Sequence, residues 1–254
     1  MIIAVASWRG TGATTAALAL AAAVASRGDG AWLVEADPAG GVLAGRMHLA
    51  AYALAGLEQV AFPSQGRAAV EVLHEVAQQI GSFDVVAAPA DPYRAFACHQ
   101  PRVPWVPALT ELPGTVVVDV GRLRAGTPVW PLLQVADEVV LATSAEVSEA
   151  VASHEWLLAG GRVSHSDPGL DDGRGRVLVV DSPGGVAFPR AGLLADLGDR
   201  CVGWLPWDPA TVDLLHRGAQ VGDRRLRRSP LVHAAQRVHE RILGATCRPL
   251  ESAS

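Results

Sequence analysis

Short runs of apolar residues, rich in Val and Ile, recur along the chain between longer stretches with helical spacing. Each run is continuously hydrophobic rather than alternating, which is typical of parallel strands that are covered on both faces. The stretches between the runs are long enough for crossover helices. The pattern therefore predicts an α/β, doubly wound fold, with a mostly parallel sheet and helices on both faces. The predicted strands are residues 2–6, 31–35, 84–88, 115–119, 138–143 and 176–181.

The segments between the predicted strands differ in character. Apolar residues at spacings of three and four predict helices over 14–27, ending at Gly28, and over 67–80. The density of proline in 89–113 predicts an irregular segment with at most short helices, either a packed surface loop or a loop that faces a partner. Ser, Asp, Gly and Pro cluster in 164–175, which predicts a surface turn.

Composition and charge narrow the classes of protein. The chain has 254 residues, of which 50% are apolar, so a large core is expected, and we expect one domain over 1–254. The net charge of −5 gives no general electrostatic reason to bind nucleic acid or an anionic membrane. No apolar run has the length of a membrane span. All 21 basic side chains are arginines, which excludes any mechanism that needs a lysine ammonium group.

The cysteines and histidines indicate no metal site. Cys98, Cys201 and Cys247 are far apart and have neither CxxC nor Cys/His ligand spacing, and the histidines form no ligand pattern. A disulfide framework is equally unsupported, so a reducing cytoplasm is the expected setting.

The strongest local signal lies at the start of the chain, where a predicted strand, a turn with Gly10 and Gly12, and an Ala/Leu-rich helix follow one another. Backbone N–H groups of such a turn, together with a helix N-terminus, form a concave anion site. The Thr14 hydroxyl occupies the place where a phosphate loop contacts magnesium. The expected nucleotide-binding residues of this turn are Arg9, Gly10, Thr11, Gly12, Ala13, Thr14 and Thr15.

This turn resembles the phosphate loop of the ParA/MinD superfamily of deviant-Walker ATPases, K-G-G-x-G-K-T-T. On that pattern Trp8 replaces the signature lysine and Ala13 replaces the Walker lysine, so the Walker A motif is degenerate. Glycines also serve ordinary tight turns, and the resemblance becomes specific only with the segments that follow.

Four later segments match the family in the correct order. Residues 34–41 resemble switch I, with Asp37 as the carboxylate that orients the attacking water and Glu35 as the earlier acid. Residues 116–121 resemble the Walker B and switch II segment, with Asp119 near magnesium. Residues 136–143 and 203–208 resemble the family's A-D-x-V strand and its late G-x-I-P-x-D segment. The resemblance implies a P-loop NTPase-like fold with ATP and Mg as cofactors, and the loss of the lysines predicts that they bind weakly or not at all.

The resemblance also implies roles for single residues. Asp37 and Asp119 are the catalytic residues if the protein is active, and Thr14, Asp37 and Asp119 are the magnesium ligands if nucleotide binds. Asp181 and Pro206 lie where relatives contact the base, although an aspartate accepts but cannot donate a hydrogen bond. By itself, an aspartate such as Asp119 at a strand end can also cap the following turn.

The loss of both lysines favours a pseudo-ATPase, because charge-assisted bonds to the β and γ phosphates are lost. Arg9, Arg122 or Arg124 are the candidates to replace the missing charge, although the planar fork of arginine is bulkier than an ammonium group. The retained Asp37 and Asp119 support the alternative, an active ATPase that cycles on DNA or membrane to partition chromosome, plasmid or other cargo.

Two features bear on partners. Trp8 takes the place of the lysine that crosses the dimer in relatives, so it either anchors a homodimer or packs against its own domain. An arginine-rich turn at 224–228 precedes a predicted helix over 230–243 with one apolar face. Three interpretations are open: the helix packs on its own sheet, the helix binds membrane, or the turn before it binds DNA. Few basic residues take part, and DNA is not an expected partner.

The single-domain layout most resembles the ATPase half of the CpaE/TadZ branch. The resemblance implies a positioning or scaffold protein for a membrane-associated secretion, pilus or division apparatus. Such a protein is expected in the cytoplasm and is recruited to the membrane or the cell pole through its protein partners.

Overall fold

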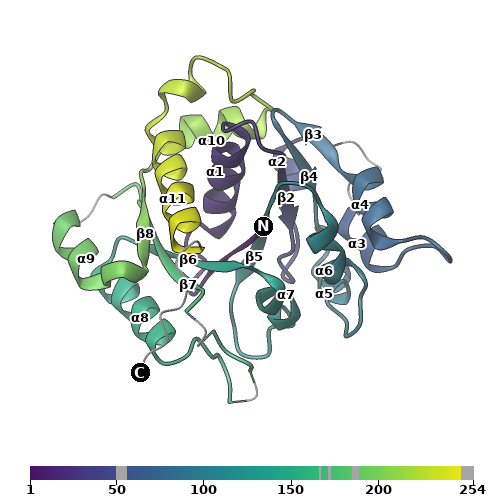
Figure 1. Ribbon diagram of the computed structural model, residues 1–254, viewed down its shortest axis with the longest axis horizontal. Helices are drawn as coiled ribbons and strands as arrows, with labels where there is room; N and C mark the ends of the chain where they lie inside the picture. The colour runs from purple at the N-terminus through teal and green to yellow at the C-terminus, as the bar shows by residue number, and fades with distance from the viewer. Residues whose placement is uncertain (50–55, 166, 171–172, 185–188, 247–254) are drawn as a thin grey trace.

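The computed structural model describes residues 1–49, 56–165, 167–170, 173–184 and 189–246. One eight-stranded sheet has the order β3-β4-β2-β5-β1-β6-β7-β8, and helices cover both of its faces (Figure 1). Every neighbouring pair is parallel except β3 and β4 at one edge. The strands are β1 (Ile2–Ser7), β2 (Ala31–Glu35), β3 (Gln78–Ile80), β4 (Phe83–Val86), β5 (Thr115–Arg122), β6 (Glu138–Ser144), β7 (Gly175–Val180) and β8 (Cys201–Leu205).

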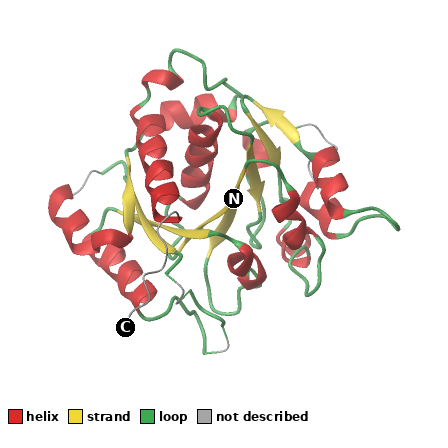
Figure 2. Cartoon of the chain, viewed as in Figure 1, coloured by secondary structure: helices red, strands yellow, loops and turns green. Residues whose placement is uncertain are grey.

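The helices form two layers, which Figure 2 shows in red on either side of the yellow sheet. One layer holds α1 (Ala13–Ala25), α2 (Leu43–Arg46), α10 (Pro209–His216) and α11 (Pro230–Thr246). The other holds α3 (Gly56–Ala61), α4 (Ala69–Val76), α6 (Trp105–Ala108), α7 (Trp130–Val135), α8 (Val147–Leu158) and α9 (Arg190–Leu197), with α5 (Pro92–Ala97) beside α3. Each layer packs its own hydrophobic cluster against the sheet, so the doubly wound prediction is confirmed.

Helix α1 lies at the centre of its layer, between the sheet and α11. Its residues are almost all buried, and most are alanine, which brings the helix close to its neighbours. A helix that is apolar on every side is stable only when it is enclosed in this way. The enclosure fixes the N-terminus of α1 at the carboxyl ends of β1 and β5, where open α/β sheets bind ligands.

Two segments differ from the prediction. The helix expected over 67–80 ends at Val76, because Ala77 leaves the helical conformation and residues 78–80 pair with β4 across the Gly81 turn. The strand β8 has no counterpart among the predicted strands, since its sequence is short and contains Gly203 and a half-buried Trp204. Both segments are edge strands. Pairing with the neighbouring strand determines their conformation more than their own hydrophobic pattern does.

The loop between 89 and 113 has the short helices that the prolines predicted, α5, α6 and one 3-10 turn at Leu109–Glu111. The turn predicted over 164–175 includes residues 166 and 171–172, which lie outside the described residues. The apolar face of α11 is buried against α1 and β8, so this face packs on its own domain. The arginine-rich turn before it contains a 3-10 turn at Leu226–Arg228.

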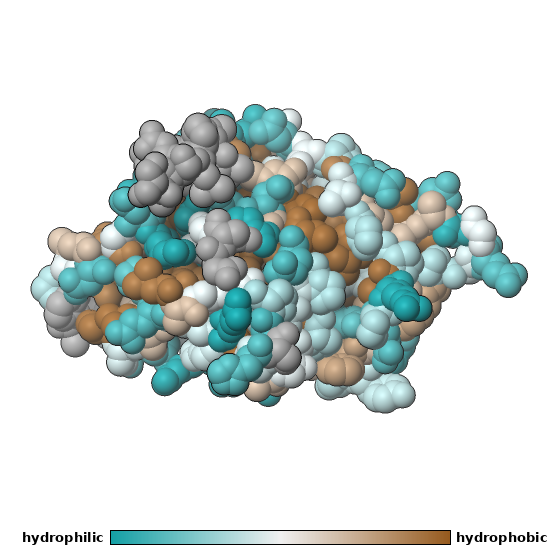
Figure 3. Space-filling model, turned by 60° about the horizontal axis from the view of Figure 1, so that its bottom comes forward, coloured by the Kyte–Doolittle hydropathy of each residue, from teal (hydrophilic) through white to brown (hydrophobic). Residues whose placement is uncertain are grey.

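The described helices include none that is long and apolar enough to cross a membrane. On the face in Figure 3, apolar residues occur in several separate patches between polar ones. Large apolar side chains that are more than one-third exposed include Val42, Phe62, Tyr93, Phe96, Leu158 and Trp207.

Candidate functional site

The glycine-bearing turn joins β1 to α1 and leaves a pocket at its concave side. Gly10 and Gly12 both have left-handed backbones, with φ of 80° and 69°, and a side chain at Gly12 would press on Val180. Only glycine adopts such a backbone conformation at low energetic cost, because it has no Cβ. A pocket of about 290 Å³ lies against this turn. It is lined by Ser7, Gly10, Gly12, Ala13, Thr14, Thr15, Asp37, Arg46, Gly121 and Arg122.

Neither Trp8 nor Ala13 brings a charge to this pocket. Ala13 is the first residue of α1, is 5% exposed and lines the pocket with a methyl group only. Trp8 is half-buried, and its ring centroid lies 5.0 Å from that of Trp156 in α8. The Trp8 ring therefore packs against its own domain, as one of the two interpretations of the sequence expected.

Switch I is held by the side chain of Glu35, which is 1% exposed at the end of β2. Its Oε1 accepts hydrogen bonds from the N–H groups of Val42 (2.6 Å) and Leu43 (2.9 Å), and its Oε2 accepts one from Ala88 (3.1 Å). Burial raises the pKa of Glu35 to about 7, against the effect of these N–H donors. A side chain at Gly41 would collide with the Glu35 carboxylate and Ala88. Glu35 thus ties the start of α2 to the end of β4.

Asp119 lies beside Glu35 in the register of β2 and β5, and it is 1% exposed. The register of β5 with β1 shifts directly after Asp119, as in a β-bulge, and such bulges re-aim side chains. The Gly121 N–H donates to Asp119 Oδ1 at 3.0 Å. Burial raises the pKa of Asp119 to about 6, while the neighbouring Thr14 hydroxyl lowers it. The sequence predicted that Thr14 and Asp119 lie at the same site, and the two side chains are neighbours in the structure.

Asp37 approaches the same place from switch I. Gly121 has a φ of 70°, and a Cβ there would lie 2.1 Å from Asp37 Cγ, so only glycine admits this carboxylate. Burial raises the pKa of Asp37, and the nearby Arg124 guanidinium lowers it. Thr14, Asp37 and Asp119 are hard oxygen donors, the class that Mg²⁺ prefers, and Mg²⁺ in phosphate-binding sites needs few protein ligands. The described residues contain no group of three His, Cys, Asp or Glu side chains that could hold a metal ion.

A second pocket, of about 440 Å³, continues from the first and shares Gly10, Gly12 and Thr15 with it. Asp181 and Pro206, which the resemblance places near the base, line it together with Trp207 and His216. Asp181 Oδ2 accepts a hydrogen bond from Arg190 at 2.5 Å, whereas its Oδ1 is buried and has no hydrogen-bond partner among the described residues. A free acceptor beside an apolar wall fits the exocyclic amine of a base. The two connected pockets therefore fit a nucleotide with its phosphates at the glycine-bearing turn.

The arginines at the site are not all those that the sequence indicated. Arg9 does not line the phosphate-side pocket, because its guanidinium faces Glu149 of α8 at 3.9 Å. Thr11 also donates to Glu149, at 3.4 Å. Arg122 lines the pocket as expected. Arg46 lines it too and was missed, because it belongs to no motif and reaches the site only through the fold of α2.

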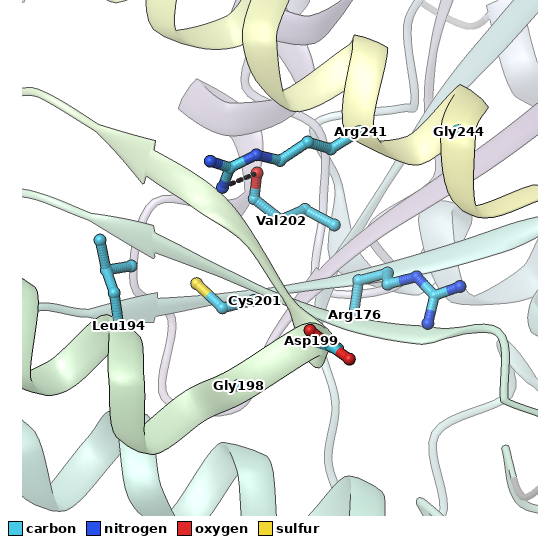
Figure 4. Close-up of a pocket in the computed structure, with 8 residues that line it drawn as sticks. All are labelled: Arg176, Leu194, Gly198, Asp199, Cys201, Val202, Arg241 and Gly244. Carbon is cyan, nitrogen blue, oxygen red and sulfur yellow. Dashed lines mark hydrogen bonds between the residues drawn. The ribbon is translucent and has the colours of Figure 1, made fainter.

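A larger cavity of about 580 Å³ lies at the opposite edge of the sheet, at the amino ends of β7 and β8. In Figure 4, Arg241 reaches from α11 to the carbonyl oxygen of Val202, to which it donates at 3.4 Å. Arg176 pairs with the buried Glu138 at 3.1 Å. Both arginines already have partners, and this cavity is remote from the glycine-bearing turn.

No protein-family model matches this chain, and no curated protein matches it. Solved structures do match. The cell division ATPase MinD of Pyrococcus furiosus is 17% identical, with 96% of this chain and 98% of that one covered and a TM-score of 0.68. The septum site-determining protein MinD of Pyrococcus horikoshii, complexed with Mg-ADP, is 14% identical, with 98% of both chains covered and a TM-score of 0.69.

A ParA family ATPase from Chlorobium tepidum is also similar, with 14% identity, 92% of this chain and 96% of that one covered, and a TM-score of 0.64. At these identities the likeness is one of fold. The chain therefore has the P-loop NTPase fold of the MinD and ParA ATPases over nearly its whole length.

Proposed function

We propose that this chain is a ParA/MinD-like pseudo-ATPase that binds nucleotide and serves as a scaffold or positioning factor. The observation that carries the proposal is the contrast at the glycine-bearing turn. Thr14, Asp37 and Asp119 line or adjoin the pocket, yet Ala13 and Trp8 present a methyl group and a stacked ring where the family has two ammonium groups. Bound Mg-ATP or Mg-ADP would supply phosphates to the turn and a cation to the carboxylates. Without the lysines, the charge that develops during phosphoryl transfer lacks its usual stabilisation.

Phosphate release by the purified protein with Mg-ATP tests this proposal. We expect binding without steady turnover. The alternative, an active ATPase that partitions cargo on DNA or membrane, is favoured by the retained Asp37 beside Gly121. Steady magnesium-dependent release that Asp37→Ala abolishes would establish the alternative.

The proposed partners are proteins of a membrane-associated secretion, pilus or division apparatus, as in the CpaE/TadZ branch, and they recruit this chain to the membrane or the cell pole. Exposed aromatic side chains support a protein–protein contact. Tyr93 is 84% exposed and Phe96 50% exposed on α5, which follows the loop that packs against Gly40 of switch I. Substitution of both by Ser should abolish capture of the apparatus proteins and leave the chain folded.

We also propose a homodimer that forms without nucleotide, because the lysine that would couple dimerisation to the partner's phosphates is replaced by Trp8. Light scattering with and without Mg-ATP measures the mass. A monomer in both conditions, or a dimer with Mg-ATP alone, contradicts this assembly.

A further inference from the structure

The phosphate-side pocket keeps positive charge although the chain has no lysine. Among the described residues that line it, the cationic side chains are Arg46 and Arg122, and both are exposed. They come from different segments: Arg46 ends α2, directly after switch I, and Arg122 ends β5, directly after Asp119 and Gly121. The two guanidinium groups therefore border the same pocket from separate walls.

Arg46 is a cation on a fixed support. Across the described part of the chain, its side chain makes no hydrogen bond and no ion pair. Its side chain borders the pocket directly, because Arg46 is one of the residues that line it. The support is fixed because Glu35 accepts the N–H groups of Val42 and Leu43 at the start of α2, and Leu43 is fully buried.

Arg122 is oriented by the residue that replaced the signature lysine. Its Nε donates to the Trp8 carbonyl oxygen at 3.2 Å, and its Cδ lies 3.9 Å from where a Gly10 Cβ would stand. The Trp8 ring is in turn held by Trp156. Because Nε is used in this contact, the terminal nitrogens of the planar fork remain for an oxyanion.

Two other arginines of the region serve as a contrast. Arg9, in the turn itself, faces Glu149. Arg124 lies near Asp37, whose pKa it lowers, but it does not line the pocket. Position in the motif therefore does not decide which arginine faces the phosphates.

We propose that Arg46 and Arg122 together bind the β and γ phosphates of a nucleoside di- or triphosphate, in place of the two missing lysines. This inference rests on the proposed nucleotide binding. The guanidinium groups reach the phosphates from the switch segments rather than from the turn, so they bind the peripheral oxygens of the ground state. Such binding holds nucleotide without the contact to the bridging oxygen that speeds cleavage. Arg46 and Arg122 are thus phosphate-binding residues of a site that retains its ligand.

Calorimetry with Mg-ATP, AMP and inorganic tripolyphosphate tests the assignment on four proteins: wild type, Arg46→Ala, Arg122→Ala and the matched control Arg9→Ala. Loss of one charge-assisted contact corresponds to about tenfold or more in affinity. We expect each of Arg46→Ala and Arg122→Ala to weaken Mg-ATP and tripolyphosphate by at least about tenfold and to leave AMP unchanged. Arg9→Ala should stay near the wild type for all three ligands. Thermal melts establish that each variant is folded.

The outcomes separate this inference from the proposed function. Mg-ATP and tripolyphosphate affinities that are unchanged in both arginine variants would overturn the assignment while nucleotide binding stands. An equal loss in Arg9→Ala would also overturn it, because the effect would then be one of general charge. Wild-type binding of tripolyphosphate that depends on Arg46 and Arg122, with no binding of Mg-ATP, would support the arginine site and refute nucleotide as its ligand. Binding of neither ligand would overturn both.

Discussion

The buried carboxylate of Glu35 should make the stability of the fold depend on pH, and Glu35→Gln should remove that dependence. Burial raises the pKa of Glu35 from 4.5 to about 7. Between these values the folded chain keeps a proton that the unfolded chain has lost, so the free energy of unfolding falls as the pH rises. The interval corresponds to about 3 kcal/mol, which is lost in full above pH 7. Glutamine carries no charge at any pH, so the free energy of unfolding of the variant does not fall for this reason.

The variant also has a cost that does not depend on pH. Its amide presents N–H groups where Glu35 Oε2 accepts from Ala88, and an unmatched buried donor costs about 1–3 kcal/mol. We therefore expect Glu35→Gln to be less stable than the wild type at pH 4.5 and to gain about 3 kcal/mol relative to it by pH 8. Burial also raises the pKa of Asp119, but this residue is present in both proteins, and the prediction therefore concerns the difference between their stabilities.

Urea unfolding at intervals between pH 4.5 and 8, followed by circular dichroism, measures the difference between the two proteins. The same change at Glu75, an exposed residue that pairs with Arg67 at 2.5 Å, is the control and should produce no such trend. A difference between wild type and Glu35→Gln that is constant over this range would refute the reasoning, because it would mean that Glu35 ionises as easily in the folded chain as in the unfolded one.

Three further predictions concern the site and the arginine-rich turn. Gly121→Ala should destabilise the chain by about 1–3 kcal/mol in urea unfolding, because its Cβ would meet Asp37 at a left-handed φ, and unchanged stability would contradict this packing. Ala13→Lys should raise Mg-ATP affinity by about tenfold in calorimetry, since it restores one charge while the Trp8 stack stays intact; a folded variant without this gain would mean that the turn does not present the position to phosphate. The wild type should bind random duplex DNA weakly at physiological salt, and nanomolar binding that is lost when the arginines of 224–228 become Ala would favour the partitioning function.

The amino-acid sequence by itself determined the class of fold, the glycine-bearing turn, Asp37 after β2 and Asp119 within β5. These features depend on local signals: a continuous apolar run predicts a buried parallel strand, and a strand, glycine turn and helix in succession predict an anion site. Thr14, Asp37 and Asp119 then meet because the carboxyl ends of parallel strands share one edge of the sheet. The match to MinD and ParA structures over most of the chain confirms the class of fold.

The tertiary structure alone decided which charges face the pocket. Arg9 stands in the motif but pairs with Glu149, whereas Arg46 stands outside any motif and lines the phosphate-side pocket. It also decided that Glu35, which the sequence presented as a second acid of switch I, ties the loops together through backbone N–H groups. Side chains far apart in the sequence converge according to strand register and loop path. No periodicity within one segment carries that information, because it arises only when the segments pack against one another.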